Sequence, residues 1–272
     1  MTSSLENRWN NFSDNDIALF SLINKTTVDN DCSYFLIGAK ARDVLLNYFD
    51  KKVNLRKTLD TDIAVCCRNW QDFYKIKTAF VNSGDFTADE KFEHRIISRK
   101  YGWLDILPFG DIKEQNSNIK WPPDYDIEFS LIGFEDTFKH AIDITIRDIT
   151  VKVTSPLGLV LLKLFAWVGR KAQKDAGDFA YIIANYFDLG NENRLYEENK
   201  DLLNETFDYT LSGCRLLGRD LKDLSIETCY RLKSFFDSDD LTNELAPSIS
   251  RAQYNYQEAR HMLQMIKQGL LD

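Results

Sequence analysis

Two acids interrupt an apolar segment at Asp60-Thr61-Asp62-Ile63-Ala64, and this pair constrains the fold more than any other feature of the 272-residue chain. On a β-strand, side chains at i and i+2 point to the same face, so both carboxylates would lie together on one open face of a sheet. Two carboxylates that close repel each other unless a cation lies between them. A hard divalent cation such as Mg²⁺, which brings phosphate oxygens with it, is the simplest explanation, although Asp-x-Asp also occurs in solvated turns.

The segment upstream predicts a strand, a tight turn and a helix. The apolar run Tyr34–Ile37 ends at Gly38-Ala39, and Val44-Leu45-Leu46 then follows a helical pattern. Backbone N–H groups at the start of such a helix stabilise anionic phosphates. Four basic side chains would add positive charge nearby: Lys40, Arg42, Arg56 and Lys57.

A third acid, Asp105, stands alone in the apolar strand Trp103-Leu104-Asp105-Ile106-Leu107. Burying an unpaired carboxylate is costly, so Asp105 needs a partner. One interpretation is an ion pair with Arg95 or Arg99 on an adjacent strand. The other joins Asp105 to Asp60 and Asp62, because three carboxylates suit a two-metal site for phosphoryl transfer.

A second charged block follows Thr154-Ser155-Pro156, which supplies a helix start. If one helix continues from Leu157, four charged side chains fall within about 80° on the helical wheel, with Asp175 beside them: Lys163, Arg170, Lys174 and Asp178. A break near Gly169, with a second helix from Arg170 or Lys171, would weaken this argument. The alternative is a solvated face with Lys171 and Lys174 paired to Asp175 and Asp178 at i,i+4.

The hydrophobic pattern predicts an α+β fold, in which a mixed sheet flanked by helices precedes a C-terminal helical domain. Ser13 and Asp16 are expected to cap the first helix. Gly218-Arg219-Asp220 is expected to end a late helix, with a structural role favoured for Arg219. We place the domains at residues 1–154 and 155–272. Further expected elements are strands near 34–37, 61–66, 95–99 and 103–107, a helix near 70–82, a turn-rich stretch at 109–126 typical of lids over nucleotides, and a hairpin of 142–146 with 149–153 about Arg147-Asp148.

Composition narrows the class of protein. A hydrophobic share of 44% with 28% charged residues is ordinary for a globular protein, and no apolar stretch is long enough to span a membrane. The five cysteines contain no Cys-x-x-Cys pair, which favours reduced thiols and the cytoplasm. A net charge of -8 argues against a general nucleic-acid coat but leaves room for a local basic cleft around one RNA end.

The motifs together resemble a known superfamily. Gly38-Ala39-x-Ala41-Arg42-Asp43-x-Leu45-Leu46, followed by Asp60-x-Asp62-Ile63, resembles the head of the polymerase-beta-like nucleotidyltransferases. It looks most like the AbiEii/AbiGii toxin family, and more distantly like the tRNA CCA-adding enzymes. The stretch from Trp103 to Phe109 resembles the strand that carries the third acid, and Ser155 to Asp178 resembles the toxin family's second signature block.

The resemblance implies site residues and cofactors. Asp60, Asp62 and Asp105 would be catalytic and would bind two Mg²⁺ ions, with Asp105 also acting as the general base. The residues expected to bind the nucleotide are Gly38, Ala39, Lys40, Arg42, Arg56, Thr58, Lys163, Arg170 and Lys174, and those expected to orient the substrates are Asp175 and Asp178. One departure is Ala39, where many relatives carry a serine whose hydroxyl holds a phosphate; backbone N–H groups, Ser33 or Thr58 could replace it.

The implied function is a metal-dependent transfer of an NMP from an NTP, for example ATP, to an RNA end such as that of tRNA, or to a protein hydroxyl. The resemblance also implies a toxin with an antitoxin partner. Two alternatives stay open: an antibiotic-modifying nucleotidyltransferase that acts on a small molecule, and a nucleotide-binding protein of the same fold without turnover, which Ala39 favours.

Overall fold

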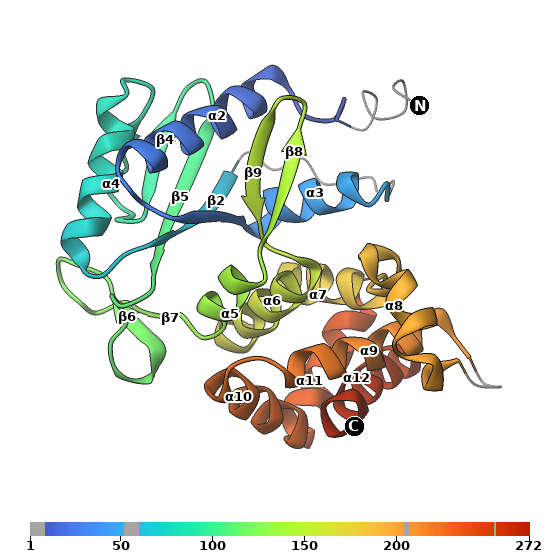
Figure 1. Ribbon diagram of the computed structural model, residues 1–272. Helices are drawn as coiled ribbons and strands as arrows, with labels where there is room; N and C mark the ends of the chain where they lie inside the picture. Colours follow the sequence, from blue (N-terminus) through green and yellow to red (C-terminus); the bar gives the residue numbers. More distant parts are fainter. Residues whose placement is uncertain (1–8, 52–59, 204–206, 253) are drawn as a thin grey trace. The chain divides into compact units, whose positions relative to one another are not determined.

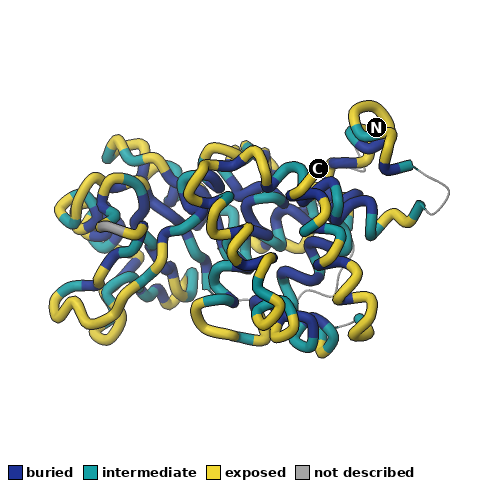
Figure 2. The backbone as a smooth tube through the Cα atoms, turned by 90° about the horizontal axis from the view of Figure 1, so that it is seen from below, coloured by how far each residue is buried: buried dark blue, intermediate teal, exposed yellow. Residues whose placement is uncertain are grey.

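The computed structural model describes residues 9–51, 60–203, 207–252 and 254–272. The chain divides into two compact units, Met1–Ser155 and Pro156–Asp272 (Figure 1). The first combines a β-sheet with helices, and in the second the described elements are helical. Buried segments run through both units, as the dark blue stretches of Figure 2 show.

The first unit is organised by a seven-stranded mixed sheet with the order β3-β4-β5-β2-β1-β9-β8. The pairs β2/β5 and β1/β9 are parallel, and the other neighbouring pairs are antiparallel. This arrangement confirms the predicted α+β class with a mixed sheet. The strands are β1 (Tyr34–Ile37), β2 (Asp60–Cys66), β3 (Thr87–Ala88), β4 (Arg95–Ser98), β5 (Gly102–Phe109), β8 (Ile142–Ile146) and β9 (Ile149–Val153).

Helices flank this sheet, and their ends follow the capping signals in the sequence. At the start of α2, the Ser13 hydroxyl accepts a hydrogen bond from the Asp16 N–H, while the Asp16 carboxylate accepts one from the Ser13 N–H. At the start of α4, the side-chain oxygen of Asn69 accepts a hydrogen bond from the Asp72 N–H. The helices of this unit are α2 (Asp14–Asp29), α3 (Gly38–Tyr48), α4 (Trp70–Asn82) and α5 (Phe134–Lys139).

A second, two-stranded sheet begins within the stretch 109–126 that was expected to be turn-rich and ends just beyond it. Its strands, β6 (Asn118–Lys120) and β7 (Glu128–Ser130), pair antiparallel. Between them, the ring of Trp121 packs 5.3 Å from that of Trp70 and is buried. The prediction therefore missed a local hairpin, which packs against α4 through the contact of Trp121 with Trp70.

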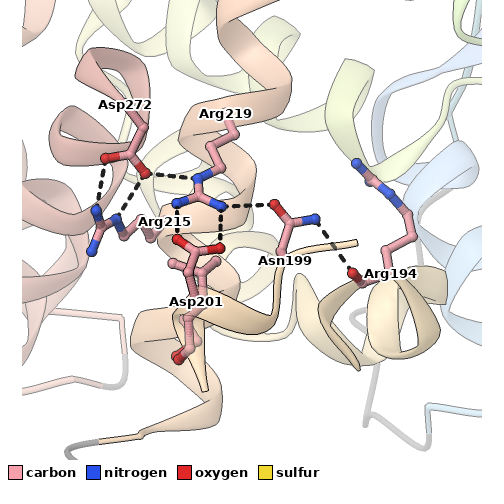
Figure 3. A network of polar contacts seen from close by, with 8 residues as sticks. Arg194, Asn199, Asp201, Arg215, Arg219 and Asp272 are labelled. Atoms are coloured by element: carbon pink, nitrogen blue, oxygen red, sulfur yellow. Dashed lines mark hydrogen bonds and ion pairs between the residues drawn. The ribbon is translucent and has the colours of Figure 1, made fainter. Parts of the chain in front are cut away.

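The second unit consists of helices, as predicted. Gly218 lies inside α9 and not at a helix end, so that expectation was wrong; it faces Gly269 of α12, where the two helices cross. Beside the crossing, Arg219 bonds Asp201 and Asp272, and Arg215 also bonds Asp272 (Figure 3). The helices are α6 (Pro156–Arg170), α7 (Gln173–Ala184), α8 (Glu192–Glu197), α9 (Tyr209–Lys222), α10 (Ile226–Asp237), α11 (Asp239–Ser250) and α12 (Tyr256–Leu271), with short turns η2 (Phe187–Asn191) and η3 (Lys200–Leu202).

Across the part of the chain that the structure describes, no helix combines the length and the apolar character that crossing a bilayer requires.

Candidate active site

The site begins where β1 passes directly into α3. All four residues of β1 are buried, and Gly38 then turns the chain with a φ of +70°, a backbone conformation that glycine adopts without strain. Ile37 occupies the cap position of α3, and the first turn of this helix carries no acidic side chain. The N–H groups at the start of α3 therefore lack a side-chain cap, which suits an anionic ligand.

Asp62 lies against this turn. A Cβ atom built on Gly38 would lie 2.1 Å from the Oδ2 atom of Asp62 and 2.8 Å from its Cγ atom. The contact follows from the register of the sheet, because Asp62 pairs with Ile37, the residue before the glycine. The carboxylate occupies the space that any larger residue at position 38 would need.

Asp60 and Asp62 share one face of β2, as the i,i+2 spacing predicts. Their side chains are partly exposed, while Thr61 and Ile63 on the opposite face are buried. On the parallel neighbour β5, Asp105 is in register with Asp62, and Trp103 with Asp60. The fold thus places all three predicted acids on adjoining strands and on the same face of the sheet.

The carboxylate of Asp105 is bound to Arg95 of β4. The two residues are cross-strand partners, and Nε and Nη2 of Arg95 donate to Oδ1 and Oδ2 of Asp105 at 2.7 and 2.8 Å. These hydrogen bonds raise the pKa of the Arg95 guanidinium above its ordinary value. This arrangement agrees with the first of the two interpretations of Asp105, an ion pair with Arg95.

A histidine, His94, also lies near Asp105. Nε2 of His94 is 3.9 Å from Oδ2 of Asp105, and the His94 ring packs 5.4 Å from the ring of Trp121. Burial lowers the pKa of His94, although the Asp105 carboxylate opposes this shift. No sequence motif marks His94; only the register of β4 and β5 brings it here.

The arrangement of the acids tests the predicted metal site. Within residues 9–51, 60–203, 207–252 and 254–272, no group of three or more Asp, Glu, His or Cys side chains is arranged to hold a metal ion. Both oxygens of Asp105 bond Arg95, so a two-Mg²⁺ site built on three carboxylates does not fit this arrangement. Asp60 and Asp62 alone supply the hard oxygen donors that suit a single divalent cation.

The two basic residues of α3 that were predicted to bind the nucleotide lie in ion pairs. Nζ of Lys40 is 2.7 Å from Oδ1 of Asp16, and the Arg42 guanidinium binds the neighbouring Asp43 carboxylate at 2.8 and 3.1 Å. Their positive charges are thus balanced within the first unit. Arg56 and Thr58 lie outside the described residues, so their predicted roles stay predictions.

The second charged block forms a helical hairpin instead of one helix. The backbone of α6 ends at Arg170, Lys171 adopts a φ of +52°, and α7 begins at Gln173. The prediction of one continuous helix was therefore wrong. The alternative with a break near Gly169 was right, except that α7 begins two or three residues later than expected.

The turn between α6 and α7 brings four of the predicted residues together. Nζ of Lys163 lies 2.6 Å from Asp178 Oδ2 and 3.6 Å from Asp175 Oδ1. Arg170 donates to both oxygens of the fully buried Asp175, at 2.6 and 2.7 Å. Lys171 binds Glu244 and Asp175 is buried, so the predicted i,i+4 pair of Lys171 with Asp175 on a solvated face was wrong; Lys174 is exposed.

The turn with its acidic pair, on a mixed sheet followed by helices, is the arrangement expected of a nucleotidyltransferase. Residues 45–267 match the family model described as nucleotidyl transferase AbiEii toxin, type IV TA system. The chain belongs to this family, and the enzyme class predicted from the sequence is confirmed. A comparison with curated proteins gives no match.

The solved structures to which the chain shows a likeness include two proteins of low sequence identity. An antigenic nucleotidyltransferase-like protein from Paracoccidioides brasiliensis is 16% identical with a TM-score of 0.41, covering 68% of this chain and 89% of its own. The antibiotic-resistance factor ANT(2'')-Ia is 12% identical with a TM-score of 0.37, covering 69% of this chain and 96% of its own.

Proposed function

We propose that the protein transfers an NMP from an NTP to the hydroxyl of an RNA end or of a protein, and that it acts as the toxin of a toxin–antitoxin pair. Membership of the family supports nucleotidyl transfer, and the family's description supports the toxin role and an antitoxin partner. The observation that carries the proposal is the contact of Asp62 with the Gly38 turn, which puts a carboxylate beside the uncapped start of α3.

The phosphates of the NTP would bind at the start of α3. Its first N–H groups and the positive end of the helix dipole attract anions. These N–H groups would take over the role of the serine hydroxyl that Ala39 lacks. The sequence departure at Ala39 is therefore compatible with phosphate binding.

Asp60 and Asp62 would hold a divalent cation such as Mg²⁺ at this place. When bound, the cation neutralises charge on the phosphates and on the leaving pyrophosphate. The acids themselves would fix where it binds, since the Asp62 carboxylate lies against the Gly38 turn.

Asp105 would accept the proton of the attacking hydroxyl. Both its oxygens bond Arg95, so this role requires the ion pair to open when the substrates bind. Before the substrates bind, Arg95 would balance the charge of Asp105 and keep its carboxylate hydrogen-bonded.

The nucleotide contacts of the α6–α7 hairpin stay predictions. Lys163 and Arg170 are held by Asp178 and Asp175, which supports the proposed orienting role of both acids. Lys174 is exposed, so a phosphate contact from Lys174 would not require it to leave the buried cluster.

Nucleotidyl transfer to separate acceptor pools tests the proposal. The purified protein is incubated with Mg²⁺ and each labelled NTP in turn, together with total RNA, cell protein or an aminoglycoside. We expect label in RNA or protein from one NTP, and none with Asp62→Asn, which keeps the side-chain volume but removes the charge. Label in the aminoglycoside alone would favour the antibiotic-modifying alternative, and binding of NTP without transfer to any pool would favour the non-catalytic one.

A further inference from the structure

The segment from Lys91 to Trp103, which includes β4 and the first residues of β5, is more basic than the chain as a whole. Between residues 91 and 103 there are four Lys or Arg residues and one acid, Glu93, in a protein whose net charge is -8. Glu93 is itself bound to Lys77, with Nζ 2.7 Å from Oε1. The basic residues are Lys91, Arg95, Arg99 and Lys100.

Aromatic rings alternate with these cations in space. Nζ of Lys91 lies 5.2 Å from the ring centroid of Phe92, and the Arg95 guanidinium lies 5.1 Å from Phe92 and 4.6 Å from Trp103. We call these four residues, Lys91, Phe92, Arg95 and Trp103, the cation–aromatic ladder. Phe92 is 38% exposed and Trp103 is 45% exposed. Single exposed aromatic residues are common on proteins, but here two of them flank one guanidinium.

The cation–aromatic ladder lies next to the proposed catalytic acids. Trp103 is the strand partner of Asp60, and neighbouring strands lie about 4.8 Å apart. Arg95, Trp103 and Asp60 are on the same face of the sheet, while Ile96 and Leu104 on the opposite face are fully buried. The ladder therefore lies on the open face, one strand away from the acidic pair.

From this juxtaposition we infer that the cation–aromatic ladder binds single-stranded nucleic acid, whose unpaired bases stack on Phe92 and Trp103. Lys91, Arg99 and Lys100, which are exposed, neutralise its phosphates, whereas the charge of Arg95 is already balanced by Asp105. The inference rests on the proposed function in one respect: the strand bound here is taken to be the acceptor.

A single strand fits the ladder better than a duplex. Stacking on an aromatic ring requires a free face of a base, and in a duplex each base is covered on both faces by its neighbours. The acidic net charge of the chain disfavours broad contact with a duplex backbone, and a short basic segment suffices for a few phosphates. The sugar is not selected by stacking, so RNA and DNA share the chemistry that the ladder recognises.

Direct binding without NTP or metal tests this inference. Fluorescence anisotropy of labelled mixed-sequence oligonucleotides of about 12 nucleotides, a length within the site sizes of such surfaces, is measured in EDTA. The probes are single-stranded RNA, single-stranded DNA and a duplex. We expect either or both single strands to bind more tightly than the duplex, and Trp103→Ala to weaken that binding roughly 5- to 100-fold, the loss of one stacked base. Trp103→Phe, which keeps a stacking face, should restore most of it.

Two further variants separate stacking from charge and from exposure alone. Lys91→Ala should lower the slope of log affinity against log salt by about 0.7, the value for one phosphate contact with a single strand. Tyr230→Ala removes an aromatic residue that is 69% exposed on α10, and it should bind like the unaltered protein. Circular dichroism of Trp103→Ala checks that the sheet is intact.

Some outcomes of these assays bear on the inference and others on the proposed function. Unchanged binding by Trp103→Ala, preference for the duplex, or no binding of either single strand would overturn the inference. Asp62→Asn should bind the strand at least as tightly as the unaltered protein, because the assay needs no catalysis. Binding that depends on Trp103 in a protein that transfers no nucleotide would therefore count against the proposed function alone.

Discussion

The Asp62 carboxylate fills the space that a side chain on Gly38 would need: a Cβ atom at position 38 would lie 2.1 Å from the Oδ2 atom of Asp62. Asp62 on β2 lies opposite Ile37, the last residue of the antiparallel neighbour β1, and Gly38 follows directly as the first residue of α3. The glycine is therefore required both by its left-handed backbone and by the carboxylate beside it. In this protein the glycine turn and the acidic pair form one structural unit.

Gly38→Ala tests this relationship. The substitution places a Cβ against a carboxylate and also strains a backbone with a φ of +70°. Gly84 is the matched control, because its φ is +85° and a Cβ there would meet nothing within 4 Å. In urea unfolding, Gly84→Ala should cost about 1–2 kcal/mol from backbone strain alone, and Gly38→Ala a further ~1–3 kcal/mol from the clash. Equal losses would show that Asp62 moves aside freely.

Local signals predicted most of what surrounds this turn. The β1 strand, the glycine, the i,i+2 acids and the Ser13 cap depend on neighbours in sequence, and the structure has each of them. Arg95 could not be chosen over Arg99 in advance. That choice depends on the β4/β5 register, which pairs Arg95 with Asp105, and register is a tertiary property.

In the α6–α7 block, by contrast, local sequence signals did not predict which residues meet. The break falls at Lys171, a residue with no special preference for a positive φ, so the sequence marks it only through the nearby Gly169. Once the helix breaks, a wheel drawn through it assigns wrong neighbours. Lys163 meets Asp178 because two helices fold back on each other, and a helical period does not encode that contact.

Arg95→Met should expose the cost of leaving Asp105 without its partner. Asp105 is 7% exposed, so removing the guanidinium takes both Arg95 hydrogen bonds from a buried carboxylate, with His94 still 3.9 Å away, and should destabilise the metal-free protein by about 3 kcal/mol. The double variant Arg95→Met with Asp105→Asn should recover part of this loss, because no charge then remains buried. Arg147→Met breaks an exposed ion pair with Asp14 and should cost less than about 1 kcal/mol.

Arg95→Met should also bind a divalent cation more tightly than the unaltered protein. Removing one positive charge beside Asp60 and Asp62, and releasing the Asp105 oxygens, should raise the affinity for Mn²⁺ about tenfold. Isothermal calorimetry with Mn²⁺ in the absence of NTP measures this directly. An unchanged affinity would mean that Arg95 does not compete with a cation at these acids.

Gly218→Ala should destabilise the second unit strongly. A Cβ at Gly218 would lie 2.2 Å from the Ile266 carbonyl oxygen and 2.8 Å from the Gly269 Cα, and both are backbone atoms that move only if α12 moves. The expected loss is about 3 kcal/mol in thermal or urea unfolding. Gly169→Ala, also helical but with nothing within 4 Å, should instead stabilise by about 0.5–1 kcal/mol. Similar effects at both positions would contradict the close crossing of α9 and α12.

The Asp272 carboxylate should make the stability of the second unit depend on pH. Hydrogen bonds from Arg215 and Arg219 hold its pKa below the ordinary value of about 3.9. A pKa that is lower in the folded state means that the stabilisation is present above about pH 4 and is lost as the pH falls through the folded pKa. Asp272→Asn should therefore be less stable than the unaltered protein at pH 7, and this difference should shrink as the solution is acidified. Asp223→Asn, which removes an exposed carboxylate at the end of α9, is the matched control for the change from Asp to Asn. A gap between Asp272→Asn and the unaltered protein that stays constant below pH 4 would assign the effect to packing instead of to the two ion pairs.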